Sequence, residues 1–188
     1  MKFKITLKVN RKFGDLLPFN YQYEQSAVIY RILAQADTQY SSWLHENGYL
    51  LHERKRFKLF CYSPFIFEKV RPLPEAGCLK IIGERAVWYI SFIPEKSTLE
   101  FIQGIFAHQS FSIGNKKYQV AFDVVGVEAM PMPQLSEEII FQALSPICVK
   151  LHEDNKTQYL SPDNPMFADG ILKGLMARYE SIHGQPFD

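Results

Sequence analysis

The chain has little cysteine, no long apolar run and almost no net charge. Among its 188 residues are three cysteines, Cys61, Cys78 and Cys148, which are widely separated and form no C-x-x-C pair. This argues against a secreted disulfide framework and against a cysteine zinc site. No apolar stretch approaches the roughly 18 residues of a membrane span, and the N-terminus lacks the apolar core of a signal peptide. We therefore expect a cytoplasmic protein without a membrane partner.

The charge balance argues against a protein that binds polyanions through its net charge alone. The chain has 21 Lys and Arg against 20 Asp and Glu, a net charge of +1, so wholesale electrostatic adhesion to a polyanion is not expected. An apolar content of 47% with 22% charged residues is typical of a globular protein and not of a disordered one. Aromatic residues are abundant, and most should lie in the core. Phe19, Tyr21 and Tyr23 are candidates to stack on a base.

Common catalytic and cofactor motifs are absent from the sequence. His45-Glu46 and His52-Glu53 begin like the zinc motif H-E-x-x-H, but position 49 is Tyr and position 56 is Arg. The sequence contains no D-x-D, no Walker A and no G-x-G-x-x-G pattern, and Ser145 lacks the surroundings of a nucleophile elbow. The sequence therefore predicts neither a cofactor nor a metal site.

The first half of the chain carries clear periodic patterns. Residues 2–10 alternate apolar and polar, which is typical of a half-buried strand. Apolar residues at helical spacing predict a helix over 23–35, and Asp37 can cap a second, short helix that ends at Asn47-Gly48. Residues 57–63 are aromatic and apolar and predict a strand.

The following segment predicts two hairpins around a helix. Residues 78–82 and 85–93, joined at Gly83-Glu84, have the pattern of a β-hairpin. Residues 97–100 (Ser-Thr-Leu-Glu) match a capping box that opens a helix. The second hairpin joins residues 111–113 through Gly114-Asn115 to a long strand ending near Met130. The helix is expected to face inward with Leu99, Ile102, Ile105 and Phe106.

The resulting β-α-β-β-α-β order over residues 1–133 is that of a ferredoxin-like α+β domain. Residues 130–133 (Met-Pro-Met-Pro) have the composition of a linker. Residues 134–188 then begin a second ferredoxin-like domain. Segments 139–144 and 146–151 should be extended, with a turn at 154–155, a short extended segment at 158–160, and a helix from 163–165 that ends at Gly184.

That last helix has an apolar face which needs a sheet, and no further strands follow it. We expect a truncated or unusually short chain. The alternative is a tail that packs on the first sheet or on another chain.

Five sequence blocks together carry a family resemblance. LPFNYQY at 17–23 runs into SAVIY at 26–30, and WLHE at 43–46, KLFCYS at 58–63 and LSPI at 144–147 follow. In this order and at these spacings they resemble the CRISPR-associated endoribonucleases that cut repeat RNA into guide units, members of the RAMP superfamily built from two ferredoxin-like domains. The chain departs from the family in one place. Family members carry a glycine-rich loop late in the second domain, whereas Gly170 and Gly174 here lie within a predicted helix.

The resemblance implies a catalytic trio at Tyr30, His45 and Lys58. Cleaving RNA without a metal uses the neighbouring 2′-hydroxyl as nucleophile and needs a proton acceptor, a proton donor and a cation near the phosphorane. Histidine suits proton transfer near neutral pH, and the C-terminal end of a helix favours the imidazolium of His45, which suits a general acid. Which of His45 and Tyr30 acts as the base stays open at this stage. The alternatives are a surface histidine, a core tyrosine and a solvated lysine.

Basic residues indicate where RNA would bind. The densest positive charge comes from Arg54, Lys55 and Arg56, with His52 just before them, and the alternative is a solvated basic loop. Arg11 and Lys12, and then Lys116 and Lys117, are weaker candidates.

Three functions are compatible with these features. The leading one is a metal-independent endoribonuclease that cleaves CRISPR repeat RNA and leaves a 5′-hydroxyl and a 2′,3′-cyclic phosphate. The second is a non-cleaving repeat-RNA-binding protein of the same fold. The third is an interaction module, since this fold hosts many functions. The resemblance implies repeat RNA as partner and an RNA-guided effector complex as a second one. The oligomeric state stays open, with a homodimer among the options.

Overall fold

The computed structural model describes residues 1–51, 55–134, 136–143, 145–153 and 156–187. In chain order its elements are β1 (Lys2–Asn10), the 3-10 turn η1 (Arg11–Phe13), β2 (Leu16–Pro18), α1 (Gln22–Ala36), α2 (Thr38–Glu46), β3 (Tyr49–Leu51), β4 (Lys55–Phe57), β5 (Phe60–Tyr62), β6 (Ile66–Phe67), β7 (Val70–Leu73), η2 (Pro74–Ala76), β8 (Cys78–Ile81), β9 (Arg85–Phe92), α3 (Glu95–Ala107), β10 (Ser110–Gly114), β11 (Gln119–Met130), β12 (Lys150–Glu153), β13 (Lys156–Tyr159) and α4 (Met166–His183).

These elements form two compact units that do not follow chain order. The first unit comprises Met1–Glu46 and Phe60–Ile139, and the second comprises Asn47–Leu59 and Ile140–Asp188. The segment 47–59, although it lies early in the chain, thus clusters with the C-terminal part. The predicted domain boundary at 133/134 stays a prediction. Within the described residues, no helix combines the length and apolarity needed to cross a bilayer.

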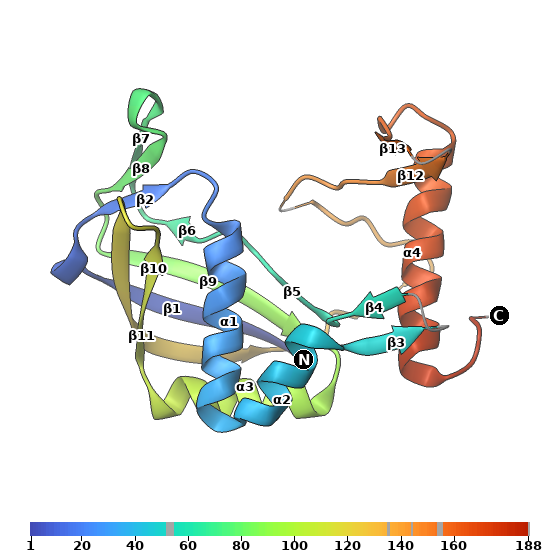
Figure 1. Cartoon of the computed structure of the whole chain (residues 1–188), viewed down its shortest axis with the longest axis horizontal. Helices are drawn as coiled ribbons and strands as arrows, with labels where there is room; N and C mark the ends of the chain where they lie inside the picture. Colours follow the sequence, from blue (N-terminus) through green and yellow to red (C-terminus); the bar gives the residue numbers. More distant parts are fainter. Residues whose placement is uncertain (52–54, 135, 144, 154–155, 188) are drawn as a thin grey trace. The chain divides into compact units, whose positions relative to one another are not determined.

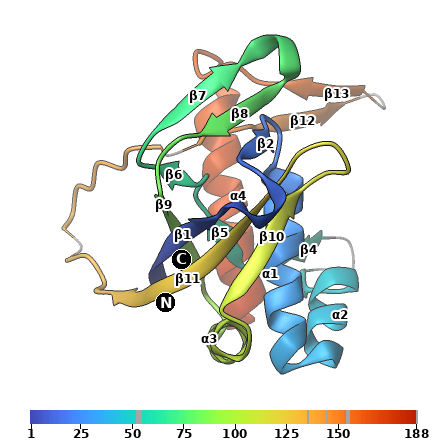
Figure 2. The same ribbon diagram turned by 90° about the vertical axis from the view of Figure 1, so that its left-hand side faces the viewer.

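The first unit is built on one antiparallel sheet of order β10-β11-β1-β9-β5, with β6 also paired to β9 (Figure 2). Apart from the added edge strand β10, the strands lie in the 4-1-3-2 order of the ferredoxin-like β-α-β-β-α-β unit. The α+β ferredoxin-like prediction is therefore confirmed. β1 forms the centre because its neighbours β11 and β9 both pair with it along most of its length.

The core lies on the face of this sheet that α1 and α3 cover (Figure 1). The alternating residues predicted to be buried in β1, Phe3, Ile5, Leu7 and Val9, are all buried. Trp88 and Phe92 of β9 reach the same layer, and the ring of Phe101 on α3 lies 4.9 Å from that of Phe92. α1 and α3 approach closely because Gly104 leaves room for the carbonyl of Ile32.

The predicted hairpin over residues 78–93 is wrong. β8 pairs with β2 and β7 in a separate three-stranded sheet, whereas β9 belongs to the main sheet. The segment between them is held by other partners. The amides of Ile82 and Gly83 donate to the Lys69 carbonyl, and those of Glu84 and Arg85 donate to the Glu68 carboxylate. These bonds replace the two-residue turn that would have joined the strands.

The capping box at 97–100 is also wrong. α3 begins two residues earlier, at Glu95, after Pro94. The Thr98 hydroxyl donates to the Pro94 carbonyl inside the first turn, and the Ser97 hydroxyl is hydrogen bonded to that of Tyr40. The inward face consequently differs from the predicted one. Ile105 is buried as expected and Ile102 is half-buried, but Leu99 and Phe106 are 54% and 61% exposed. The buried positions of α3 are Ser97, Thr98, Phe101, Gly104 and Ile105.

The predicted strand over 57–63 is interrupted. Leu59 has a left-handed backbone with φ of 55°, a conformation that strands do not contain. The chain before it belongs to β4, which pairs with β3, and the chain after it forms β5, which pairs with β9. In the chain, Leu59 therefore separates β4 of the second unit from β5 of the first unit.

The second unit contains two hairpins, β3–β4 and β12–β13, and the helix α4. The guanidinium of Arg178 on α4 lies 5.1 Å from the ring centre of Phe57 on β4. α4 ends as predicted at Gly184, whose φ is 70°. The described part of 139–144 lies outside any strand, and only the last two residues of 146–151 enter β12. The predicted turn at 154–155 lies outside the described residues.

Candidate active site

The corner between α1 and α2 is fixed by polar contacts. The Asp37 carboxylate accepts the Tyr40 amide at 2.8 Å, as the capping prediction required, and forms an ion pair with Lys96 at 3.3 Å. The hydrogen bond that the Tyr40 backbone amide donates, and then the contact with Lys96, lower the pKa of Asp37. The Ser41 hydroxyl donates to the Tyr30 carbonyl at 2.8 Å. α2 is thereby held folded back against α1.

This corner brings Tyr30 and His45 together, as their assignment to one site requires. Their ring centres are 5.0 Å apart, with the rings nearly perpendicular at 82°. His45 is exposed in the last turn of α2, and Tyr30 is half-buried on α1. One protonatable imidazole and one phenol thus share a partly covered surface of the first unit.

Two aromatic residues of β5 complete the surroundings of Tyr30. The ring of Phe60 lies 5.8 Å from that of Tyr30 and 6.3 Å from that of Tyr62. Burial, and then the neighbouring Tyr62, raise the pKa of Tyr30 above that of an ordinary tyrosine. The Tyr30 phenol therefore stays protonated at neutral pH. The block KLFCYS at 58–63 contained both residues, but nothing in it distinguished them from core aromatics.

Lys58 belongs to the second unit and is half-buried. Its side chain lies over Gly48, where a β-carbon would stand 3.3 Å from Cδ and 3.4 Å from Nζ of Lys58. Burial, and then the positive charge of Arg56, lower the pKa of Lys58. The ammonium is thus a better proton donor than that of a solvated lysine.

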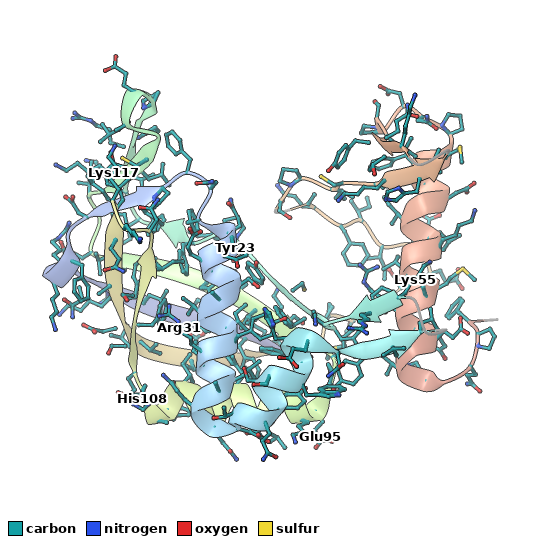
Figure 3. All side chains as sticks on the ribbon, in the orientation of Figure 1. Tyr23, Arg31, Lys55, Glu95, His108 and Lys117 are labelled. Carbon is teal, nitrogen blue, oxygen red and sulfur yellow. The ribbon has the colours of Figure 1, made fainter. Side chains whose placement is uncertain are left out.

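The basic residues predicted to bind RNA differ in their contacts. Lys55 and Arg56 are exposed on β4 (Lys55 is labelled in Figure 3), while His52 and Arg54 lie outside the described residues. Arg11 donates to three carbonyls of residues 81–83 and pairs with Glu84 at 3.0 Å and Asp15 at 3.7 Å. Arg11 therefore holds the chain between β8 and β9. Lys12 is exposed, with its ammonium 5.5 Å from the ring centre of Phe13.

The remaining basic candidates and the aromatic residues proposed to stack on a base also differ in exposure. Lys116 and Lys117 are exposed in the turn between β10 and β11, and the ammonium of Lys117 lies 4.8 Å from the ring centre of Tyr118. Tyr21 cannot stack on a base, because it is buried against Phe65 and its hydroxyl accepts the Phe65 amide at 3.0 Å. Tyr23 is 82% exposed and keeps that option. Across the described ranges, no three His, Cys, Asp or Glu side chains gather as a metal site would need.

Comparisons with known families account for both parts of the chain. The model of the N-terminal region of CRISPR-associated protein Cas6 matches residues 16–122, and the model of the C-terminal region of that protein matches residues 130–188. The chain belongs to the Cas6 family. The resemblance deduced from the sequence blocks is thereby confirmed.

Several curated relatives are named as CRISPR-associated endoribonucleases. The chain is 26% identical to CRISPR-associated endoribonuclease Cas6 1 of Methanocaldococcus jannaschii, over 98% of this chain and 68% of the relative. It is 27% identical to a putative CRISPR-associated endoribonuclease-like protein Cas6 of Pyrococcus furiosus, over 91% of this chain and 67% of the relative. This confirms the prediction of an endoribonuclease family, and these names do not favour the non-cleaving alternative.

Solved structures agree with the ferredoxin-like fold. A Cas6-related protein from Pyrococcus furiosus superposes with a TM-score of 0.79 at 26% identity, covering all of this chain and 73% of that one. A structure described as a RAMP protein binding different RNA substrates superposes with a TM-score of 0.77 at 25% identity, covering 99% and 73%.

Proposed function

We propose that this Cas6 chain is a metal-independent endoribonuclease that cleaves CRISPR repeat RNA with Tyr30, His45 and Lys58 as its catalytic residues. The observation that carries the proposal is the 5.0 Å pairing of the Tyr30 and His45 rings at the α1–α2 corner, in a chain of this family. An imidazole beside a phenol in one partly covered corner supplies a proton acceptor and a hydrogen-bond donor for RNA cleavage.

Each residue of the trio has a distinct role in the proposed reaction. The 2′-oxygen attacks the adjacent phosphorus, the bond from phosphorus to the 5′-oxygen breaks, and a 2′,3′-cyclic phosphate and a 5′-hydroxyl result. Tyr30 stays protonated at neutral pH, because burial and Tyr62 raise its pKa, so it acts as a hydrogen-bond donor. His45 then takes the 2′ proton. Lys58, whose pKa is lowered, stabilises the phosphorane and transfers a proton to the departing 5′-oxygen.

The RNA surface of this proposal includes the basic residues of β4. Lys55 and Arg56 are exposed on the strand that directly precedes Lys58 in the chain, and Arg54 and His52 adjoin them in sequence. Their charges would contact phosphates on either side of the cleaved bond. We place the reaction in the cytoplasm, with an RNA-guided effector complex as the recipient of the product.

The test is cleavage of a 5′-labelled transcript that contains the CRISPR repeat of the source organism, in excess EDTA. We expect products ending in a 2′,3′-cyclic phosphate, and no cleavage when the scissile nucleotide carries 2′-hydrogen. His45→Ala should slow cleavage by at least about 10²-fold and leave RNA affinity unchanged, since general acid–base catalysis contributes about 10²–10⁴-fold.

The matched control is His183→Ala, which removes another histidine from the last turn of an exposed helix, α4. It should cleave at the wild-type rate. A requirement for magnesium, or equal rates for the two histidine variants, would refute the proposed mechanism. Tight binding of the repeat with no product from the wild-type chain would favour the non-cleaving alternative instead.

A further inference from the structure

A pocket of about 370 Å³ in the first unit lies outside the Tyr30–His45 corner. It is lined by residues of β1, η1, α1, β10 and β11 and by His108, which follows α3. Figure 3 labels Arg31 on α1 and His108 at the end of α3.

The charge around this pocket has one sign. Lys12, Arg31 and His108 come from three separate elements, and no Asp or Glu is found among the described residues that line it. All three basic side chains are exposed. The Asp123 carboxylate accepts a hydrogen bond at 3.2 Å from the side-chain amide of Asn10, which lines the pocket. The cations of Lys12 and Arg31, with the His108 ring as a further hydrogen-bonding group and no carboxylate among the described lining residues, mark a site for an anion.

The guanidinium of Arg31 is oriented by the fold. One of its terminal nitrogens donates to the Ser112 carbonyl at 2.7 Å, which ties α1 to the edge strand β10. An arginine side chain has five N–H donors, so this bond leaves donors for a ligand while limiting the freedom of the group. A planar, partly immobilised guanidinium is well suited to phosphate oxygens.

An aromatic surface adjoins the cations. Phe13 is 51% exposed at the end of η1, and the ammonium of Lys12 lies 5.5 Å from its ring centre. Exposed aromatic rings beside basic side chains are the usual arrangement for single-stranded nucleic acid, since bases stack on the ring while cations contact the backbone. The polar side chains of Gln35, Ser110 and Ser112 add hydrogen-bonding groups.

We infer that this pocket binds a ribonucleotide phosphate. Arg31, Lys12 and His108 would hold the phosphate, and Phe13 would stack on the adjacent base. The inference rests on the proposed function in one respect, because the ribonucleotide is taken to belong to the RNA that the protein processes. It adds Arg31, His108 and Phe13 to the RNA surface, at a place distinct from the cleavage site.

The test measures binding of the full chain to a fluorescein-labelled 12-nucleotide oligouridylate between 50 and 300 mM KCl. Arg31→Ala should weaken binding about tenfold, and the slope of log K against log salt should fall by about 0.7, the value for one lost phosphate contact on a single strand. Phe13→Ala should weaken binding about fivefold without changing the slope, because stacking carries no charge.

The matched control is Arg71→Ala, which removes an exposed arginine on β7, outside the pocket. It should change neither affinity nor slope. Equal behaviour of Arg31→Ala and Arg71→Ala would overturn the inference. Because cleavage is measured separately with His45→Ala, a chain that binds the oligonucleotide at this pocket but does not cut would refute only the proposed function.

A second measurement covers the case in which Arg31→Ala does not fold. Oligonucleotide containing 4-thiouridine should crosslink to a peptide that contains Phe13 in the wild-type chain, and crosslinks confined to other peptides would overturn the inference. Uridine monophosphate serves as a competitor. Loss of the crosslink in its presence supports a nucleotide pocket, and persistence supports a site for a phosphate within a strand.

Discussion

The ring of Tyr30 is half covered by protein and lies among Phe60, Tyr62 and His45. Burial disfavours the phenolate, and the neighbouring Tyr62 adds to this effect, so the pKa of Tyr30 is raised and its hydroxyl stays protonated at neutral pH. At the scale of single residues, this leaves His45 as the proposed proton acceptor.

The rates of two variants test that assignment. Tyr30→Phe removes only the hydroxyl and should lower the cleavage rate about tenfold, whereas His45→Ala removes the proton acceptor and should lower it by at least about 10²-fold. Single-turnover rates at saturating RNA measure both. A larger loss in Tyr30→Phe than in His45→Ala would reverse the roles.

Gly48 is the residue on which the position of Lys58 depends. Its φ of 67° is left-handed, and a β-carbon there would stand 2.7 Å from the Phe57 carbonyl oxygen as well as against the Lys58 side chain. Gly48→Ala should therefore displace Lys58 and reduce cleavage about tenfold or more at saturating RNA.

Gly77→Ala is the matched control for this variant, since Gly77 has a similar φ of 64° but nothing within 4 Å of its would-be β-carbon. Both variants bear the cost of a left-handed alanine, about 1–2 kcal/mol. Only Gly48→Ala adds the collision. Equal cleavage rates in the two variants would mean that Lys58 is not held through Gly48.

At the scale of elements, the contact between α1 and α3 organises the first unit. A β-carbon on Gly104 would lie 1.8 Å from the Ile32 carbonyl oxygen, so the two helices cannot keep their separation with any larger residue at this position. One of these two helices, α1, also forms the candidate-site corner, because α2 folds back on it through the hydrogen bond from Ser41 to the Tyr30 carbonyl. Close helix packing thus supports the geometry of the candidate site.

Gly104→Ala should destabilise the protein by about 3 kcal/mol, the upper range for overpacking. In a chain of this size the melting temperature would fall by roughly 6–12 °C. Gly126→Ala is the control, since its β-carbon would meet Thr6 at 3.7 Å, an ordinary contact. Thermal unfolding followed by circular dichroism measures both variants, and equal melting temperatures would show that the helices can separate without cost.

At the scale of the whole molecule, the two units differ in how much they bury. The first unit contains nearly all of the buried apolar residues, whereas none of the 18 residues of α4 in the second unit is fully buried. Local opening costs least where few apolar contacts must be broken. The second unit should therefore open without unfolding the first.

Amide hydrogen exchange measures this difference. The amides of α4 and of the β12–β13 hairpin should exchange at least about tenfold faster than those of β1 and β9. Both of these strands pair with neighbours on both sides in the main sheet. Protection of α4 equal to that of β1 would show that the two units unfold together.

Local chemistry was sufficient for several features. Alternation determined β1 and its buried face, Asp37 determined the start of α2, and Gly184 the end of α4, because each depends on neighbours within a few residues. The sequence blocks also determined the family.

Which strands pair is a different matter, since pairing depends on distant partners. The bonds of Lys69 and Glu68 to residues 82–85 direct β8 and β9 into different sheets, and Pro94 with Tyr40 moves the start and the inward face of α3.

The candidate site divides in the same manner. The family resemblance was enough to propose Tyr30 and His45, but their 5.0 Å separation follows from the way α2 folds back on α1. The raised pKa of Tyr30 likewise depends on β5, which comes from thirty residues further along the chain. The pocket of Arg31 and His108 gave no signal in the sequence, because its residues meet only when a helix, an edge strand and a turn pack together. Tertiary packing alone brings such distant side chains within bonding range.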